Sequence, residues 1–169
     1  MRRYLLTALA ALVVACAMPL LASAQERAVI LTSAELGRVV PPGFYFQGQS
    51  AQTQMRNSAA ARFGSDRHVI AGMVDTSGYA ADVRSKYEGF LITDTTVLIN
   101  GTKLPTGAYG FGFSNDGKLT VMDISGKEVL SVDTMKDKLF KRPRPLMMTG
   151  GDRGARLYSG RDYVVISAQ

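Results

Sequence analysis

Short runs of β-prone residues, broken at close intervals by Gly, Asn, Asp and Pro, dominate the sequence from His68 onward. Runs such as HVIAGMVD, YEGFLIT, KLTVM and DYVVIS have the length and composition of strands, and turn-forming residues lie between them. This punctuation is typical of all-β sandwiches and barrels. The sequence therefore predicts an antiparallel β-sandwich or partly closed barrel with one or two short helices.

Several chain reversals are indicated by turn chemistry. Asn100-Gly101 separates two β-prone runs, and both residues tolerate the positive φ of a type I′ hairpin turn. In SNDGK, Gly117 suits the left-handed position of a hairpin loop. Further tight turns are predicted at Pro105-Thr106-Gly107, Ser125-Gly126 and Ser159-Gly160.

Helical signals are few and lie before His68. TSAELG, residues 32–37, has the makings of one helical turn, with Thr32 or Ser33 as N-cap and Gly37 as the stop. Residues 50–63 are ambiguous. An apolar stripe at intervals of four predicts a helix there, but the second half of the segment reads equally well as a strand. The stripe is formed by Ala51, Met55, Ala59 and Phe63.

An aromatic row alternates with glycines in GAYGFGF. Tyr109, Phe111 and Phe113 share one face of the expected strand, because alternate strand residues point the same way. They would form either a ligand-stacking platform or the inner face of the sandwich. The return strand favours the inner face, because Leu119 and Val121 alternate there with polar residues. This hairpin is thus expected to have one apolar and one polar face.

The glycines that alternate with the aromatic row leave the other face of the strand bare. Glycine inside a strand weakens it and often marks a close approach by another part of the chain. We therefore expect a neighbouring loop to lie across Gly110 and Gly112.

The first 24 residues have the layout of a secretory signal peptide, which leaves a single β-sandwich domain over residues 25–169. Two arginines precede an apolar run, and Ala22-Ser23-Ala24 supplies the small residues of a cleavage site. We expect cleavage near Ala24 and a periplasmic or extracellular location. Two alternatives are a lipoprotein modified at Cys16 in VVAC and an uncleaved membrane anchor.

Composition narrows the chemistry of the mature chain. Its only cysteine, Cys16, leaves with the signal peptide, so no disulfide is expected and packing alone must stabilise the domain. The signal takes two arginines and no acidic residue, so the net charge falls from +6 to +4. This mildly basic balance does not indicate a strong polyanion binder, and no nucleic acid is expected as a partner.

A basic segment is the first candidate contact. It places five positive charges in nine residues, relieved only by Asp137. Such a segment either docks on an anionic surface or serves as a solvated edge that prevents aggregation. Its prolines, Pro143 and Pro145, make it a crossing loop or a sheet edge. The candidate residues are Lys136, Lys138, Lys141, Arg142 and Arg144.

A polar stretch, QGQSAQTQMRNS, is the second candidate. Amides beside an arginine suit sugar hydroxyls and carboxylates, although polar surface loops share this composition. The candidate ligand contacts are Gln47, Gln49, Gln52, Gln54, Arg56 and Asn57.

Catalytic groups are sparse. The mature chain has one histidine, His68, and no cysteine or G-x-S-x-G sequence, so familiar nucleophile arrangements lack their parts. No catalytic residue, metal site or cofactor is indicated. Carboxylates that meet in space would still permit glycoside hydrolysis, but no spacing selects a pair.

The segment VLINGTKLPTGAYGFGF resembles a hairpin of small exported bacterial β domains, in which G-x-x-L-x-A-G-x-Y links two strands. Gly101, Leu104, Gly107 and Tyr109 keep that pattern, with Thr106 in place of the usual alanine. The mature chain is also similar to an uncharacterised family of small secreted bacterial β-sandwich proteins, in phrases such as MVDTSGY and KRPRPL. The resemblance implies an exported β-sandwich and no particular activity.

These observations favour an exported, non-catalytic binding module of the bacterial cell envelope, with a glycan or peptide as the favoured ligand. The alternative is an envelope-associated structural protein that contacts anionic surfaces through the basic segment. A hydrolase using carboxylates is a third interpretation. The expected partner is an envelope glycan, peptide or protein, and the chain is expected to be a monomer.

Overall fold

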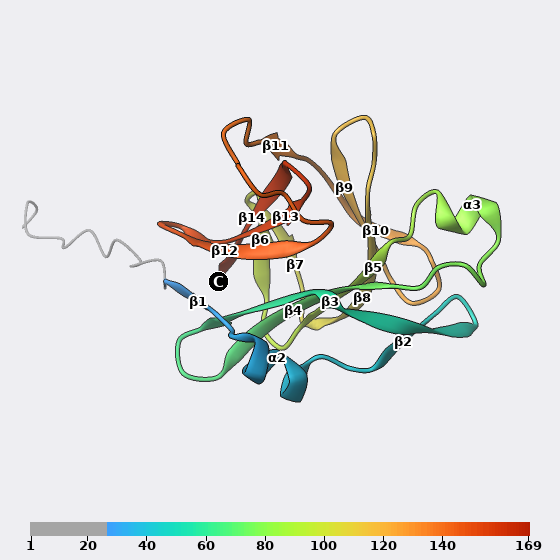
Figure 1. Cartoon of the computed structure of the whole chain (residues 1–169), viewed down its shortest axis with the longest axis horizontal. Helices are drawn as coiled ribbons and strands as arrows, with labels where there is room; N and C mark the ends of the chain where they lie inside the picture. Colours follow the sequence, from blue (N-terminus) through green and yellow to red (C-terminus); the bar gives the residue numbers. More distant parts are fainter. Residues whose placement is uncertain (1–26) are drawn as a thin grey trace, which may run out of the picture.

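The computed structural model describes residues 27–169, which form two antiparallel β-sheets and two short helices (Figure 1). The predicted all-β sandwich is confirmed, and neither sheet closes into a barrel. The predicted signal peptide, its cleavage site and Cys16 lie outside the described residues.

The large sheet has eight strands, in the order β1-β3-β4-β5-β8-β9-β10, with β2 paired to β3. Its strands are β1 (Ala28–Ile30), β2 (Gly43–Phe46), β3 (Gln49–Phe63), β4 (Arg67–Val74), β5 (Gly89–Thr93), β8 (Gly107–Phe113), β9 (Lys118–Met122) and β10 (Glu128–Asp133).

The small sheet has six strands, in the order β12-β13-β14-β6-β7, with β11 paired to β14. It lies over one face of the large sheet (Figure 1). Its strands are β6 (Val97–Ile99), β7 (Thr102–Leu104), β11 (Met135–Lys136), β12 (Met147–Gly151), β13 (Gly154–Ser159) and β14 (Asp162–Ala168).

The main core lies between the two sheets and includes the aromatic row. Phe111 is 1% exposed and packs with buried residues of both sheets, such as Leu119 and Leu157. Tyr109 and Phe113 are partly buried against the same cluster. The prediction that the row faces inward is therefore confirmed.

A second apolar cluster covers the opposite face of the large sheet, where the sequence predicted a polar surface. The ring of Phe46 stacks on that of Tyr87 with centroids 4.0 Å apart, and Phe90 and Met122 belong to the same cluster. A Cβ at Gly110 would press against the Phe46 ring. The polar face is therefore confined to the end of the hairpin. The loop predicted to lie across Gly110 is replaced there by the Phe46 ring of β2.

The predicted turns are present with the backbone conformations expected. Asn100 and Gly101 have φ of 48° and 85°, and Gly117 has φ of 81°. The Asn100 side chain also joins the small sheet. Its Oδ1 accepts a hydrogen bond from the Val165 N–H at 2.8 Å, and its Nδ2 donates to the Asp133 carbonyl at 2.8 Å. It thus bridges the point where β14 changes partner from β6 to β11.

The segment before His68 differs most from expectation. Of the two interpretations of residues 50–63, the helix is wrong, and the strand predicted for the second half is confirmed. The whole segment belongs to β3, which pairs with β4 on one side and with β1 and β2 on the other.

The predicted helical turn is helix α2 (Ser33–Val39), with Thr32 as N-cap. The predicted stop at Gly37 is wrong, because the helix continues to Val39 and its C-cap is Val40. Helix α3 (Ala81–Arg84) and strands β1, β2, β11 and β12 were not predicted.

Candidate functional site

Positive charge is concentrated on the small-sheet end of the molecule. Residues 134–169 contain eight Lys and Arg against three Asp and Glu, whereas residues 27–133 contain ten of each. The first group forms strands β11 to β14 and the connections between them. The net charge of the described chain therefore comes entirely from this end.

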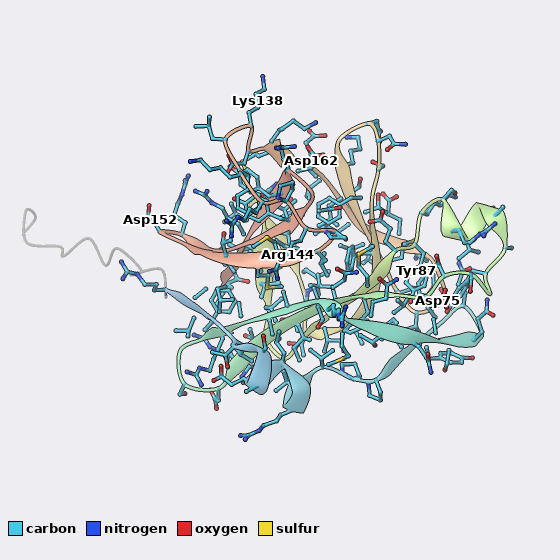
Figure 2. All side chains as sticks on the ribbon, in the orientation of Figure 1. Asp75, Tyr87, Lys138, Arg144, Asp152 and Asp162 are labelled. Carbon is cyan, nitrogen blue, oxygen red and sulfur yellow. The ribbon has the colours of Figure 1, made fainter. Side chains whose placement is uncertain are left out.

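The connection between β11 and β12, residues 137–146, is named here the basic loop. It carries Lys138, Lys141, Arg142 and Arg144, all exposed, and the side chain of Lys138 points away from the body of the protein (Figure 2). Lys136 lies just before it in β11 and pairs with Asp162 at 3.3 Å. The predicted crossing loop is thus present, and it presents four of the five predicted cations.

The single carboxylate of the basic loop turns inward and fixes its first turn. Asp137 Oδ1 accepts a hydrogen bond from the Leu139 N–H at 3.1 Å, and Oδ2 accepts one from the Tyr158 hydroxyl at 3.3 Å. The Asp137 N–H donates to the Arg161 carbonyl at 2.9 Å. The outward side of the loop therefore carries cations without a carboxylate among them.

Aromatic stacking and backbone contacts hold the rest of the basic loop. The ring of Phe140 stacks on Tyr158 with centroids 4.7 Å apart and planes 13° apart. The Arg144 carbonyl accepts a hydrogen bond from the Gly160 N–H at 2.9 Å, and Leu146 is buried. Because the loop is already held in one arrangement, little further ordering is needed when it meets a partner.

An open hollow of about 540 Å³ lies on the outer face of the small sheet. It combines apolar side chains from β6, β11 and β14 with the guanidinium-bearing Arg153. On the same face, Arg156 lies over the Tyr163 ring, 5.3 Å from its centroid. The lining residues are Leu98, Asn100, Gly101, Met135, Arg153, Val165 and Ser167.

The predicted glutamine-rich contact is dispersed over a turn and a strand. Gln47 has φ of 46° and forms the β2–β3 turn with Gly48. Gln49 and Gln52 are an odd number of residues apart on β3, so their side chains point to opposite faces.

The rest of that stretch lies where the pairing of β3 with β4 shifts register, between Thr53 and Ser58. Gln54 Nε2 donates to the Val74 carbonyl at 3.0 Å, and its Oε1 accepts from Asn57 Nδ2 at 2.8 Å. These two amides are occupied within the fold, and Arg56 is exposed beside them.

A polar cleft of about 300 Å³ lies beside Gly112, at the end of the large sheet. Serines, a threonine and charges of both signs line it, among them Lys86 and Glu128. Close to it, Glu88 Oε2 accepts a hydrogen bond from the Phe113 N–H at 3.0 Å, while burial raises the pKa of Glu88. The cleft was not predicted as a site, because its residues come from three separate segments.

We expect Glu88→Gln to raise the free energy of unfolding at neutral pH by about 1 kcal/mol. The folded-state pKa of Glu88 is raised above its unfolded value, so this carboxyl favours folding least once pH has risen above both values. Glutamine keeps an oxygen for the Phe113 N–H and never ionises. Urea unfolding at neutral pH and near pH 4 should show the gain only at neutral pH. Glu128→Gln, at an exposed carboxylate, is the control, and an equal gain there would contradict the burial argument.

Catalytic groups remain sparse in the part of the chain that the structure describes. His68 Nδ1 lies 3.4 Å from Asp94 Oδ2 near the start of β4. Within residues 27–169, no group of three or more His, Cys, Asp or Glu side chains is placed to hold a metal ion. None of the helices in that range is both long and apolar enough to cross a membrane.

No family model matches the chain, and no match was found among curated proteins or solved structures.

Proposed function

We propose that this chain is an exported, non-catalytic binding module of the bacterial cell envelope that docks on anionic, phosphate-bearing surfaces through the basic loop. The observation that carries this proposal is the segregation of charge. Within residues 27–169, all of the net positive charge lies in residues 134–169, and residues 27–133 are balanced. The proposed function combines two expectations from the sequence, namely a binding module and an anionic contact through the basic segment.

The structure of the basic loop supports the same choice. Its one acidic side chain is held by hydrogen bonds to Leu139 and Tyr158, and the charged side chains that follow it in the loop are all cations. Arginine and lysine near an anionic membrane surface contribute about 1 kcal/mol each, and this contribution falls as salt screens the charges. The glutamine-rich stretch supports a glycan or peptide ligand less well, since Gln54 bonds to the Val74 carbonyl and Asn57 bonds to Gln54.

We expect a triple charge reversal, Lys138→Glu with Lys141→Glu and Arg142→Glu, to weaken binding to anionic vesicles by about a hundredfold. Protein expressed from the full sequence and purified after export would be sedimented with vesicles of phosphatidylglycerol and phosphatidylcholine. Wild-type binding should fall steeply as salt is added.

The matched control changes the same amount of charge in the balanced part of the chain. Arg38→Glu, Arg84→Glu and Lys127→Glu are all exposed and lie outside the small-sheet end. This variant should keep most of the binding. Equal losses in the two variants would show that only net charge matters, and absent or salt-independent wild-type binding would overturn the proposal.

A further inference from the structure

One large apolar side chain stands out on the surface of the basic loop. Leu139 is 88% exposed, whereas the other exposed large apolar residues of the described chain lie between 38% and 55%. It follows Lys138 directly and lies two residues before Lys141. A single exposed apolar side chain is ordinary on a protein surface. This one differs from the others in lying among the cations of the basic loop.

The loop buries one of two consecutive apolar residues and presents the other. Phe140 turns inward onto the Tyr158 ring, at 4.7 Å between centroids. Leu139 is directed outward by the turn in which its own N–H bonds Asp137 Oδ1 at 3.1 Å and the Phe140 N–H bonds the Asp137 carbonyl at 3.4 Å. The outward leucine is therefore part of a fixed turn that is anchored on the sheet.

We infer that the anionic surface is a lipid bilayer, and that Leu139 enters the boundary between headgroups and acyl chains while the neighbouring cations contact lipid phosphates. This inference rests on the proposed function and specifies its partner. Stable attachment to a membrane generally requires two signals, such as apolar burial together with attraction to anionic lipids. The basic loop supplies both within five residues, from Lys138 to Arg142.

Charge and geometry also agree on how the loop would sit. Lysine and arginine can extend their charged ends to the headgroups while their aliphatic stems lie in the apolar layer, so the cations do not oppose insertion of the leucine. A soluble polyanion offers no apolar layer, and Leu139 would remain in water against it. A bilayer and a phosphate polymer therefore make opposite predictions for this one side chain.

A tryptophan reporter tests insertion directly, because the chain contains no tryptophan. In Leu139→Trp, fluorescence should shift to the blue on adding phosphatidylglycerol vesicles and should be quenched by lipids brominated on their acyl chains. The control is Ile124→Trp, at a residue that is 52% exposed in the β9–β10 turn of the balanced part of the chain. That reporter should show neither change. Unchanged emission from Leu139→Trp on bound vesicles would overturn the inference.

A truncation separates the bilayer from other phosphate sources. Leu139→Ala should lose about fiftyfold in affinity for the anionic vesicles, because three apolar carbons no longer enter the membrane. Its affinity for soluble inorganic polyphosphate should stay unchanged. Its melting temperature should also hold, since the leucine is 88% exposed.

The outcomes distinguish this inference from the proposal on which it rests. The inferred insertion is wrong if Leu139→Ala binds vesicles as tightly as the wild type does. It is also wrong if the variant loses the same factor in affinity for vesicles and for polyphosphate. Salt-sensitive binding through the loop cations would then still stand. If the wild type binds neither probe, the proposed function fails as well.

Discussion

Replacing Phe111 by alanine is expected to lower the free energy of unfolding by about 4 kcal/mol. The ring is 1% exposed and lies in the main core between the sheets, where Leu119, Val121 and Leu157 belong to the same cluster. Truncation would remove its apolar contacts and leave a cavity that two hydrogen-bonded sheets cannot readily close. Urea unfolding would measure the loss. We expect the slope of the unfolding free energy against urea concentration to stay unchanged.

Phe113→Ala is the matched comparison, because it removes the same ring from the same strand. Phe113 is only partly buried, and its ring stands perpendicular to that of Phe111 with centroids 6.0 Å apart. Phe113→Ala should therefore lower the free energy of unfolding by less, about 2 kcal/mol. A cost below about 1 kcal/mol for Phe111→Ala would contradict burial and restore the idea of a stacking platform.

Local chemistry made the hairpins predictable. Asn100-Gly101 and Gly117 need positive φ, a requirement that only a few residue types meet, so their letters alone locate the turns. The N-cap at Thr32 was also predictable from nearby residues, since its N–H donates to Glu35 Oε2 at 2.7 Å. These interactions span no more than a few residues, and a sequence pattern captures them.

Strand β3 as a whole could not be predicted from local sequence patterns. Its Gln, Ala and Met residues have good helix propensity, and its apolar positions fall at intervals of four. Pairing with β4 and β1 overrides both signals, because the strand gains ladder hydrogen bonds along both edges. Those partners lie elsewhere in the chain, so no window around β3 contains the deciding information.

The second apolar cluster was hidden for the same reason. Phe46 comes from β2, Tyr79 and Tyr87 flank helix α3, and Phe90 comes from β5. Each ring is unremarkable alone, and the set becomes a core only when the sheet brings the segments together. An alternating Phe44 and Phe46 in GFYF was the one local signal for β2.

The candidate site was also predictable only in part. The cations of the basic loop were visible as a charge run, but the outward Leu139 and inward Phe140 were not distinguishable from the letters KLFK. Their orientation depends on Tyr158, which receives the Phe140 ring and donates to Asp137. A partner some twenty residues downstream thus decides which apolar residue faces the solvent.

Gly112→Ala is expected to lower the free energy of unfolding by about 3 kcal/mol, although it adds a single methyl group. The predicted close approach of a loop at this glycine is confirmed. A Cβ there would overlap the Lys86 carbonyl oxygen and lie 2.8 Å from its carbon. A backbone carbonyl cannot rotate away as the end of a flexible side chain can.

The Lys86 segment is held on both sides, so it has little room to yield. Its N–H donates to the Val83 carbonyl at 3.0 Å, and the Glu88 N–H donates to the Phe111 carbonyl at 2.8 Å. Tyr87 lies between them, 1% exposed, with its ring stacked on Phe46. Relieving the overlap would therefore disturb a buried ring and a hydrogen bond to β8.

Gly37→Ala provides the opposite case within the same chain. Gly37 lies in helix α2 with nothing within 4 Å of an added Cβ, so alanine should stabilise the protein by about 0.5–1 kcal/mol through helix propensity. If Gly→Ala raises the free energy of unfolding at Gly37 and lowers it at Gly112, the cost at Gly112 comes from the Lys86 carbonyl. A gain at both positions in chemical unfolding would mean that the loop moves aside freely, and the bare face of β8 would then need another cause.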